Sequence, residues 1–228
     1  LLAGVTSLYY VNFFDKVETR FHKIESRFKK WILGGIMLAV LFAVFPSLFG
    51  EGYESIKLLA DFKTESLVKD SLLLNYINNK WILLIFIILT LLFKAIAAAI
   101  TMGSGGNGGN FAPSLFVGAY LGFAFSFFLT LIGFNDIPVI NFTIVAMAGI
   151  LSGVFHAPLT AIFLIAEITG GYELIIPLMI VSAISYLIVK KFHPQSLDIR
   201  RLKDKGAIVS ENKDTSILSK IDVKEMIE

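Results

Sequence analysis

Residues 103–113 read Gly-Ser-Gly-Gly-Asn-Gly-Gly-Asn-Phe-Ala-Pro, and this run lies between two stretches that are apolar enough to enter a membrane. Five of its first seven residues are glycine, so it is a poor continuation of a lipid-facing helix. Irregular backbone is tolerated at membrane depth only where protein covers it or where it lines a polar cavity. The stretch from Phe111 to about Phe128 can again form a helix, because Pro113 falls in its first turn. We therefore predict a helix that begins inside the membrane, where its free N–H groups and partial positive charge suit an anion.

The composition is that of a membrane protein with several spans. Hydrophobic residues make up 56% of the 228 residues, and the mean hydropathy of +0.76 is far above that of soluble domains. The runs Trp31–Phe49 and Trp81–Thr101 are each long enough to cross about 30 Å of hydrocarbon. Ile137–Ala166 is too long for one untilted helix, whereas Leu174–Val189 is slightly short for a full crossing. This mixture predicts an all-α, polytopic membrane protein whose discontinuous, tilted helices meet near the midplane.

The glycines leave a second interpretation open. Gly149, Gly153 and Pro158 interrupt the long run Ile137–Ala166, and we expect two shorter helices that separate around His156-Ala157-Pro158. Alternatively, the protein is an ordinary helical membrane protein in which glycines allow close helix packing. A large soluble helical protein is disfavoured, because the spans carry almost no polar face.

Positive charge is concentrated at the two ends of the apolar region. Basic residues precede the first full span and follow the last one, at Lys16, Arg20, Lys23, Arg27, Lys29, Lys30, Lys190, Lys191, Arg200, Arg201, Lys203 and Lys205. The positive-inside rule places both clusters in the cytoplasm and residues 50–80 outside. Because the clusters flank membrane spans, we expect them to orient the protein and not to bind nucleic acid.

Two charged residues fall within apolar stretches. Lys94 lies in the run that ends at Thr101, and we expect it either to reach toward the cytoplasmic face or to pair within the protein, with a functional role left open. Glu167 is either a functional carboxylate inside the membrane or a helix-end carboxylate bonded to nearby backbone or to Thr169.

The residue types argue against an enzyme. The chain has no cysteine, and its three histidines are scattered without metal-ligand spacing. The glycine run lacks the Lys-Ser/Thr of a phosphate loop. We therefore expect no catalytic residues, no metal and no cofactor.

Several motifs occur in an order that is typical of one family. Gly109-Asn110-Phe111-Ala112-Pro113 fits Gly-x-Phe-x-Pro, and Ala148 to Thr160 is similar to a Gly-Met-Gly-Ala…Arg-Ala-Pro-Leu-Thr stretch. Ile165 to Pro177 is similar to Leu-Glu-Met-Thr…Tyr-Leu-Ile-Pro. With these motifs, nearly all of residues 1–205 resembles the C-terminal half of the CLC family of chloride channels and proton-coupled anion transporters.

The resemblance implies a homodimer with one anion pathway in each subunit, built from two inverted halves of which this chain is the second. It implies that Gly109, Asn110, Phe111, Ala112 and Pro113 bind the central anion, with the N–H groups of Asn110 and Phe111 as donors. It also implies that three helices form the dimer face, around Ala146–Phe155, Leu159–Thr169 and Leu174–Val189.

The resemblance further implies two regions, a transmembrane anion-transport domain at 1–205 and a cytoplasmic linker at 206–228. In this family such a linker often leads to regulatory CBS modules. Leu1–Phe14 looks like the end of a longer apolar segment and the chain does not begin with Met, so we expect an N-terminal half to precede it. The expected location is a bacterial plasma membrane, with the C-terminus in the cytoplasm.

Two departures from the family pattern qualify this expectation. The family often has a tyrosine near the start of its last helix that contacts the anion, whereas here Leu197, or alternatively Ser196, takes that position. We predict a less constricted or less selective inner gate. The gating and proton-coupling glutamates belong to the other half, so the chain does not distinguish a channel from an antiporter.

The predicted function is therefore transport of an anion, chloride first, across a membrane in which lipid surrounds the chain. One alternative is a fluoride-selective relative, which could also lack the tyrosine. Another is a membrane-embedded structural or regulatory subunit without a pathway of its own.

Overall fold

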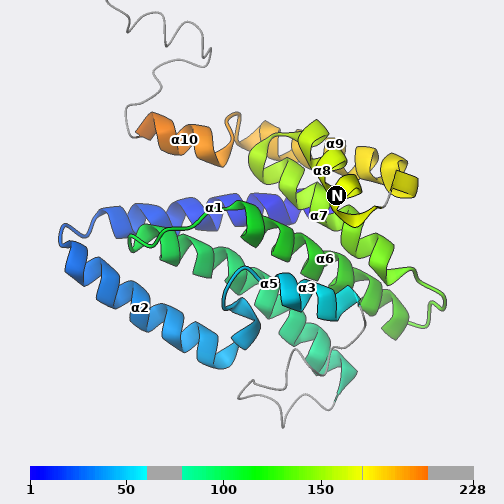
Figure 1. The fold of residues 1–228 in the computed structure, drawn as a ribbon, viewed down its shortest axis with the longest axis horizontal. Coiled ribbons are helices and arrows are strands. Elements are labelled where there is room, and N and C mark those ends of the chain that lie inside the picture. The colour runs from blue at the N-terminus through cyan, green and yellow to red at the C-terminus, as the bar shows by residue number, and fades with distance from the viewer. Residues whose placement is uncertain (61–78, 171, 205–228) are drawn as a thin grey trace, which may run out of the picture.

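A computed structural model describes residues 1–60, 79–170 and 172–204, and every regular element in these ranges is a helix. Figure 1 shows α1 and α5 in the middle of the fold, with α2 beside α5 and the helices α7, α8 and α9 gathered at the other side. The elements are α1 (Leu2–His22), α2 (Arg27–Val44), η1 (Pro46–Leu48), α3 (Tyr53–Ala60), α5 (Lys80–Gly103), α6 (Phe111–Leu131), α7 (Val139–Phe155), α8 (Pro158–Thr169), η3 (Tyr172–Leu174), α9 (Ile175–Phe192) and α10 (Leu197–Asp204). The predicted all-α fold is confirmed.

Three helical stretches in the described residues are long and apolar enough to cross a membrane. They are Lys80–Gly103, Phe111–Leu131 and Tyr172–Leu202, while Val139–Phe155 and Pro158–Thr169 are shorter apolar helices. Full-length and short apolar helices thus alternate along the chain. This alternation agrees with the predicted membrane protein with discontinuous helices.

The helices on both sides of the glycine run were predicted closely. The expected span Trp81–Thr101 lies within α5, whose Asn79 side chain accepts a hydrogen bond from Trp81 N–H at 3.0 Å. The expected helix from Phe111 is α6, which begins at that residue. The intervening residues 106–109 have no regular secondary structure, and glycine's backbone freedom explains why neither helix continues into them.

The long apolar run divides at one place only. α7 continues through Gly149 and Gly153, so the prediction that these glycines interrupt the helix is wrong. The expected separation around His156-Ala157-Pro158 is confirmed, because His156 adopts the left-handed conformation with φ 56° and α8 begins at Pro158. Proline is favoured at the first position of a helix because its missing N–H has no acceptor there.

Pairs of glycines four residues apart bring helices into backbone contact. A methyl group added at Gly118 or Gly122 of α6 would lie 2.5 Å from Met147 Cα or 2.3 Å from Phe142 O of α7. At Gly153 it would lie 2.5 Å from the Ser7 hydroxyl of α1. The packing role of glycine was the alternative interpretation, and it applies to these positions.

The first predicted span ends earlier than expected. The expected run Trp31–Phe49 is helical only as far as Val44, because Pro46 cannot continue the helix and Phe45 turns to an extended φ of −124°. A short 3-10 helix follows, and the chain then turns back toward α3. This turn leaves the backbone carbonyls of Leu48 and Gly50 without a hydrogen bond inside a helix.

Two ion pairs hold α10 against α1. Arg200 Nη1 lies 2.6 Å from Asp15 Oδ2, and Arg201 Nη2 lies 2.8 Å from Glu18 Oε1. Partial burial raises the pKa of the Asp15 carboxyl, although the neighbouring Arg200 guanidinium acts in the opposite direction. The predicted linker 206–228 lies outside the described residues.

Candidate anion-binding site

The first turn of α6 has unused backbone donors. Phe111 and Ala112 occupy its first two positions, and in the described part of the chain nothing accepts a hydrogen bond from their N–H groups. Pro113 has no N–H, and Ser114 N–H donates to the Asn110 carbonyl at 3.0 Å. Two donors at the positive end of a 21-residue helix are therefore available to a ligand.

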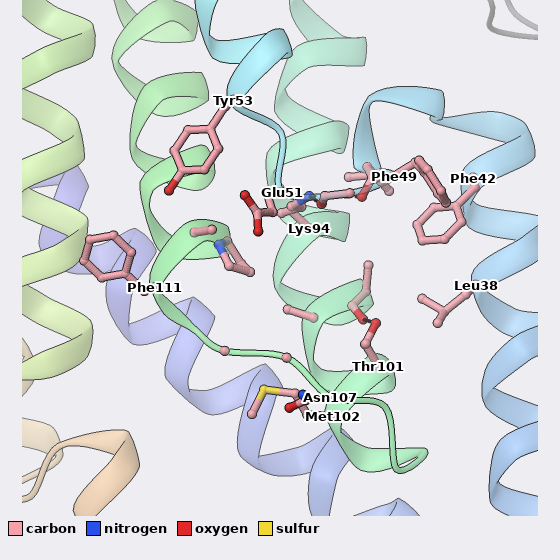
Figure 2. A pocket seen from close by; sticks show the side chains of 18 residues that line it. Leu38, Phe42, Phe49, Glu51, Tyr53, Lys94, Thr101, Met102, Asn107 and Phe111 are labelled. Atoms are coloured by element: carbon pink, nitrogen blue, oxygen red, sulfur yellow. Dashed lines mark hydrogen bonds between the residues drawn. The ribbon is translucent and has the colours of Figure 1, made fainter. Parts of the chain in front are cut away.

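A cavity of about 630 Å³ lies beside this turn. Its wall comes from the start of α6, from the C-terminal half of α5, from α2 and from the chain between η1 and α3 (Figure 2). Figure 2 shows the Tyr53 hydroxyl and the Glu51 carboxylate on the side of the cavity opposite Asn107 and Met102. The cavity volume is ample for a small hydrated anion, and most of the side chains around it are apolar or glycine.

Lys94 brings a positive charge to the same cavity. Its ammonium group donates to Leu48 O at 3.0 Å and to Gly50 O at 2.9 Å, and it lies 4.5 Å from the ring centre of Phe116 in α6. The residue is 3% exposed and forms no ion pair with a carboxylate among the described residues. Of the two expectations for Lys94, pairing within the protein is the one observed, and its partners are the carbonyls freed by the turn after Pro46.

Four of the five predicted site residues line the cavity. Gly109, Phe111, Ala112 and Pro113 are part of its wall, and the Phe111 ring lies 6.4 Å from that of Phe155 in α7. Asn110 is not part of this wall and is 5% exposed. The run at 109–113 thus presents one face to the cavity and one side chain to the interior.

The partner of Asn110 is a residue that sequence reasoning missed. The hydroxyl of Tyr10, which is fully buried in α1, donates to Asn110 Oδ1 at 3.4 Å. The two residues are 100 positions apart, and Tyr10 lies in an apolar helix where a tyrosine is an ordinary core residue. No local pattern in the sequence marks this contact.

The two candidates for the inner-gate position lie at the start of α10. Ser196 precedes the helix and Leu197 is its first residue, and both are buried, at 6% and 1% exposure. Leu197 belongs to the same apolar cluster as Tyr10. The side chain that begins this helix therefore adds an apolar surface and no hydroxyl donor.

Glu167 lies apart from the cavity wall. Its side chain is exposed near the end of α8 and accepts a hydrogen bond from the Tyr172 hydroxyl, while Thr169 donates to Ile165 O. Of the two interpretations, this geometry fits the helix-end carboxylate, with Tyr172 as its partner in place of Thr169. In the described ranges no three His, Cys, Asp or Glu side chains gather where they could hold a metal ion.

Comparison with known proteins identifies the family. Residues 1–190 match the family described as voltage gated chloride channel. A Ralstonia nicotianae protein provisionally described as ClcB-like chloride channel is 28% identical over 190 residues, which are 82% of this chain and 40% of that protein. The voltage-gated ClC-type chloride channel ClcB of Escherichia coli strain SMS-3-5 is 30% identical over 169 residues, or 72% of this chain and 35% of that protein.

The ClcB protein of Shigella boydii is likewise 30% identical, over 167 residues, with 72% of this chain and 35% of the relative covered. The chain therefore spans about two fifths or less of the length of these relatives. The match extends over most of the chain, and the motif Gly109–Pro113 lies inside it. The chain is a multi-pass membrane protein that belongs to the CLC family of voltage-gated chloride channels.

Proposed function

We propose that the protein transports a small anion, chloride first, and that the first turn of α6 binds the ion in passage. The observation that carries this proposal is the pair of unused N–H donors at Phe111 and Ala112 beside a cavity inside an apolar fold. Neutral backbone donors replace water around an ion without the deep energy well of a directly bound Lys or Arg. Release of the ion then remains possible.

Lys94 supports the same function from a second position. Its charge is held by carbonyl groups and not by a carboxylate among the described residues, so it adds positive potential to the cavity wall. The names of the relatives all refer to chloride channels, which favours chloride as the anion. A channel and a proton-coupled antiporter both fit this half-site.

The rest of the pathway is proposed to come from an N-terminal half of the same protein, because the chain covers only 35–40% of these relatives. We further propose 1–205 as the transport domain, 206–228 as a cytoplasmic linker, and a bacterial plasma membrane as the location with the C-terminus in the cytoplasm. A regulatory domain would follow that linker.

A homodimer is proposed through the outer faces of α8 and α9. These faces expose large apolar side chains at Leu159 (68%), Phe163 (60%), Ile176 (66%) and Leu187 (63%). The third stretch expected at the dimer face, Ala146–Phe155, has no exposed residue and packs between α6 and α9, and its place in a dimer stays a prediction. Lipid would cover the remaining apolar surface.

The test removes one donor and keeps the helix. Phe111→Pro in the full-length protein deletes the first N–H of α6 at the first helical position, where proline is common, although it follows Asn110 in a helical conformation that a proline disfavours. A hydrogen bond to an ion is worth about 1.5–3 kcal/mol, so chloride efflux from reconstituted vesicles should fall about tenfold to a hundredfold. Phe111→Ala, which also loses the ring but keeps the N–H, is the matched control. Equal efflux from the two variants would contradict the proposal.

The same vesicles separate the alternatives. Chloride and fluoride efflux measured side by side show which halide is preferred, and fluoride preference would support the fluoride-selective alternative. If neither ion passes through the correctly folded wild-type protein, it is a structural or regulatory subunit.

A further inference from the structure

One imidazole joins α1, α9 and α10. His193 follows the last residue of α9, and its two ring nitrogens contact two other helices. Nε2 lies 2.9 Å from Asn12 Oδ1 of α1, and Nδ1 lies 3.1 Å from Arg200 Nη1 of α10. The same Arg200 nitrogen lies 2.6 Å from Asp15 Oδ2 of α1. One nitrogen of Arg200 therefore connects α10 to both neighbouring helices.

These contacts determine the protonation state of His193. An arginine side chain has donors only, so the Nδ1 atom beside Arg200 must offer its lone pair. The ring hydrogen is then on Nε2, which donates it to the amide oxygen of Asn12. His193 is therefore neutral in this arrangement, and protonation of Nδ1 removes an acceptor from Arg200.

Arg200 has no alternative acceptor within the described residues. Its Nε and Nη2 atoms are fully shielded and form no hydrogen bond there, so Nη1 makes the contacts that hold this side chain. A protonated His193 would place a second cation beside the guanidinium, with Asp15 as the carboxylate that both share. Protonation therefore replaces a hydrogen bond by repulsion between like charges.

Other ionisable groups near this end of α9 do not offset that repulsion. They are Glu18 and His22 of α1, Lys190 and Lys191 of α9, Asp198 and Arg201 of α10, and His156 between α7 and α8. Glu18 lies 2.8 Å from Arg201 Nη2 and is already paired, and Asp198 is exposed to solvent, which screens its charge. The remaining groups are bases.

A displacement of α10 would reach the candidate anion-binding site by two routes. Arg201 Nη1 lies 4.0 Å from Met102 Sδ, and Met102 is part of the cavity wall. Leu197, the first residue of α10, belongs to the apolar cluster of Tyr10, whose hydroxyl donates to Asn110 Oδ1. Without α10 in place, Met102 and Tyr10 lose part of their support, so the anion should bind more weakly.

We propose that His193 makes α10 a pH-sensitive element: neutral His193 holds α10 against α1, and protonated His193 releases it and lowers anion transport. This inference rests on the proposed anion transport. The response falls between about pH 8 and about pH 5, the interval in which histidine changes its charge. The Arg201–Glu18 ion pair contains no imidazole and keeps α10 attached at one point.

The position of α10 is measured without reference to transport. Spin labels are attached at Arg20→Cys of α1 and Leu202→Cys of α10, which are both exposed in a chain that has no cysteine of its own. Any cysteine elsewhere in the full-length protein is replaced by serine. Acidification from about pH 8 to about pH 5 should raise the population of displaced α10 about tenfold, as expected for a lost hydrogen bond to a charged group.

Substitutions at His193 separate its charge from its size. His193→Gln keeps a neutral acceptor and a donor, so both the label distance and chloride efflux from vesicles should lose this pH response. His193→Arg is always charged, so at about pH 8 it should show the displaced α10 and an efflux lower by about threefold or more. His22→Gln is the control, because this exposed imidazole lies 3.8 Å from Glu18 and its loss should leave the wild-type response intact.

The possible failures are distinguishable. A label distance that ignores pH, or that responds equally in His193→Gln, would overturn the inference. So would an efflux whose pH dependence is the same in wild-type protein and in His193→Gln although the labels move. If the wild-type protein passes no anion at any pH, the proposed function is wrong and the effect on transport falls with it. Thermal unfolding of each variant shows that folded proteins are compared.

Discussion

α6 and α8 both begin at a break in an apolar stretch and both carry proline in the first turn, yet their starts have different surroundings. The start of α6 lines a cavity together with Lys94, and its N-cap Asn110 is held by Tyr10. The start of α8 follows His156 and Ala157, likewise has no side-chain cap, and presents Leu159 at 68% exposure. The residues of its first turn, Pro158, Leu159 and Thr160, are not part of the cavity wall.

The comparison shows that a helix start among apolar segments is not in itself an anion site. Both helices have unused first-turn donors and the same dipole direction. Only α6 adds a cavity, a buried cation and a polar side chain held in place. The surroundings, and not the helix end alone, distinguish the two.

A matched pair of proline variants tests this difference, and we expect it to give the largest effect. Leu159→Pro removes a first-turn N–H of α8 as Phe111→Pro does in α6, and each places proline after a residue of helical or near-helical conformation. Chloride efflux should fall about tenfold or more for Phe111→Pro and by less than about twofold for Leu159→Pro. Similar losses in both variants would mean that helix integrity, and not anion binding, limits transport.

Lys94→Met tests how much the buried cation contributes to anion transport. The change leaves the carbonyls of Leu48 and Gly50 without a donor inside the protein, which should cost about 1–3 kcal/mol of stability. The cavity also loses about 1 kcal/mol of electrostatic attraction to the ion, because its positive charge is gone. Chloride efflux should therefore fall severalfold. Lys94→Arg keeps the charge and the donors and serves as control. Wild-type efflux in folded Lys94→Met would exclude an electrostatic role.

Leu197→Tyr tests the inner-gate position, with the smallest expected effect. The predicted looser gate follows from the absence of a hydroxyl at Leu197, so a tyrosine should raise chloride affinity by about threefold, roughly the net value of one hydrogen bond. Leu197→Phe adds the ring without the hydroxyl and controls for overpacking at a residue that is 1% exposed. Calorimetric chloride titration compares the two variants, and equal affinities would contradict the predicted role of the hydroxyl.

Local sequence features predicted the helix borders around the site well. The glycine run and Pro113 defined the start of α6, because glycine and proline act on their own backbone. The same reasoning overestimated the effect of Gly149 and Gly153. Inside a helix that is packed on both sides, contacts with α1 and α9 outweigh the intrinsic cost of glycine.

The long-range contacts of the site could not be predicted from neighbouring residues in the sequence. Lys94 pairs with carbonyls 46 and 44 positions earlier in the chain, and Tyr10 reaches Asn110 across 100 positions. Such pairs depend on the tertiary arrangement, and a single sequence contains no periodicity that indicates them. The intramembrane position of Lys94 was nevertheless a sign that some partner had to exist.

The glycine contacts between α6 and α7 have a mechanical consequence. At Gly118 and Gly122 the two helices touch backbone to backbone, so no side chain between them can change rotamer and let them slide. α10 is held to α1 by arginine and carboxylate side chains, which are long and rotatable. α6 and α7 therefore move as one unit, whereas α10 can shift against α1 when these side chains change rotamer.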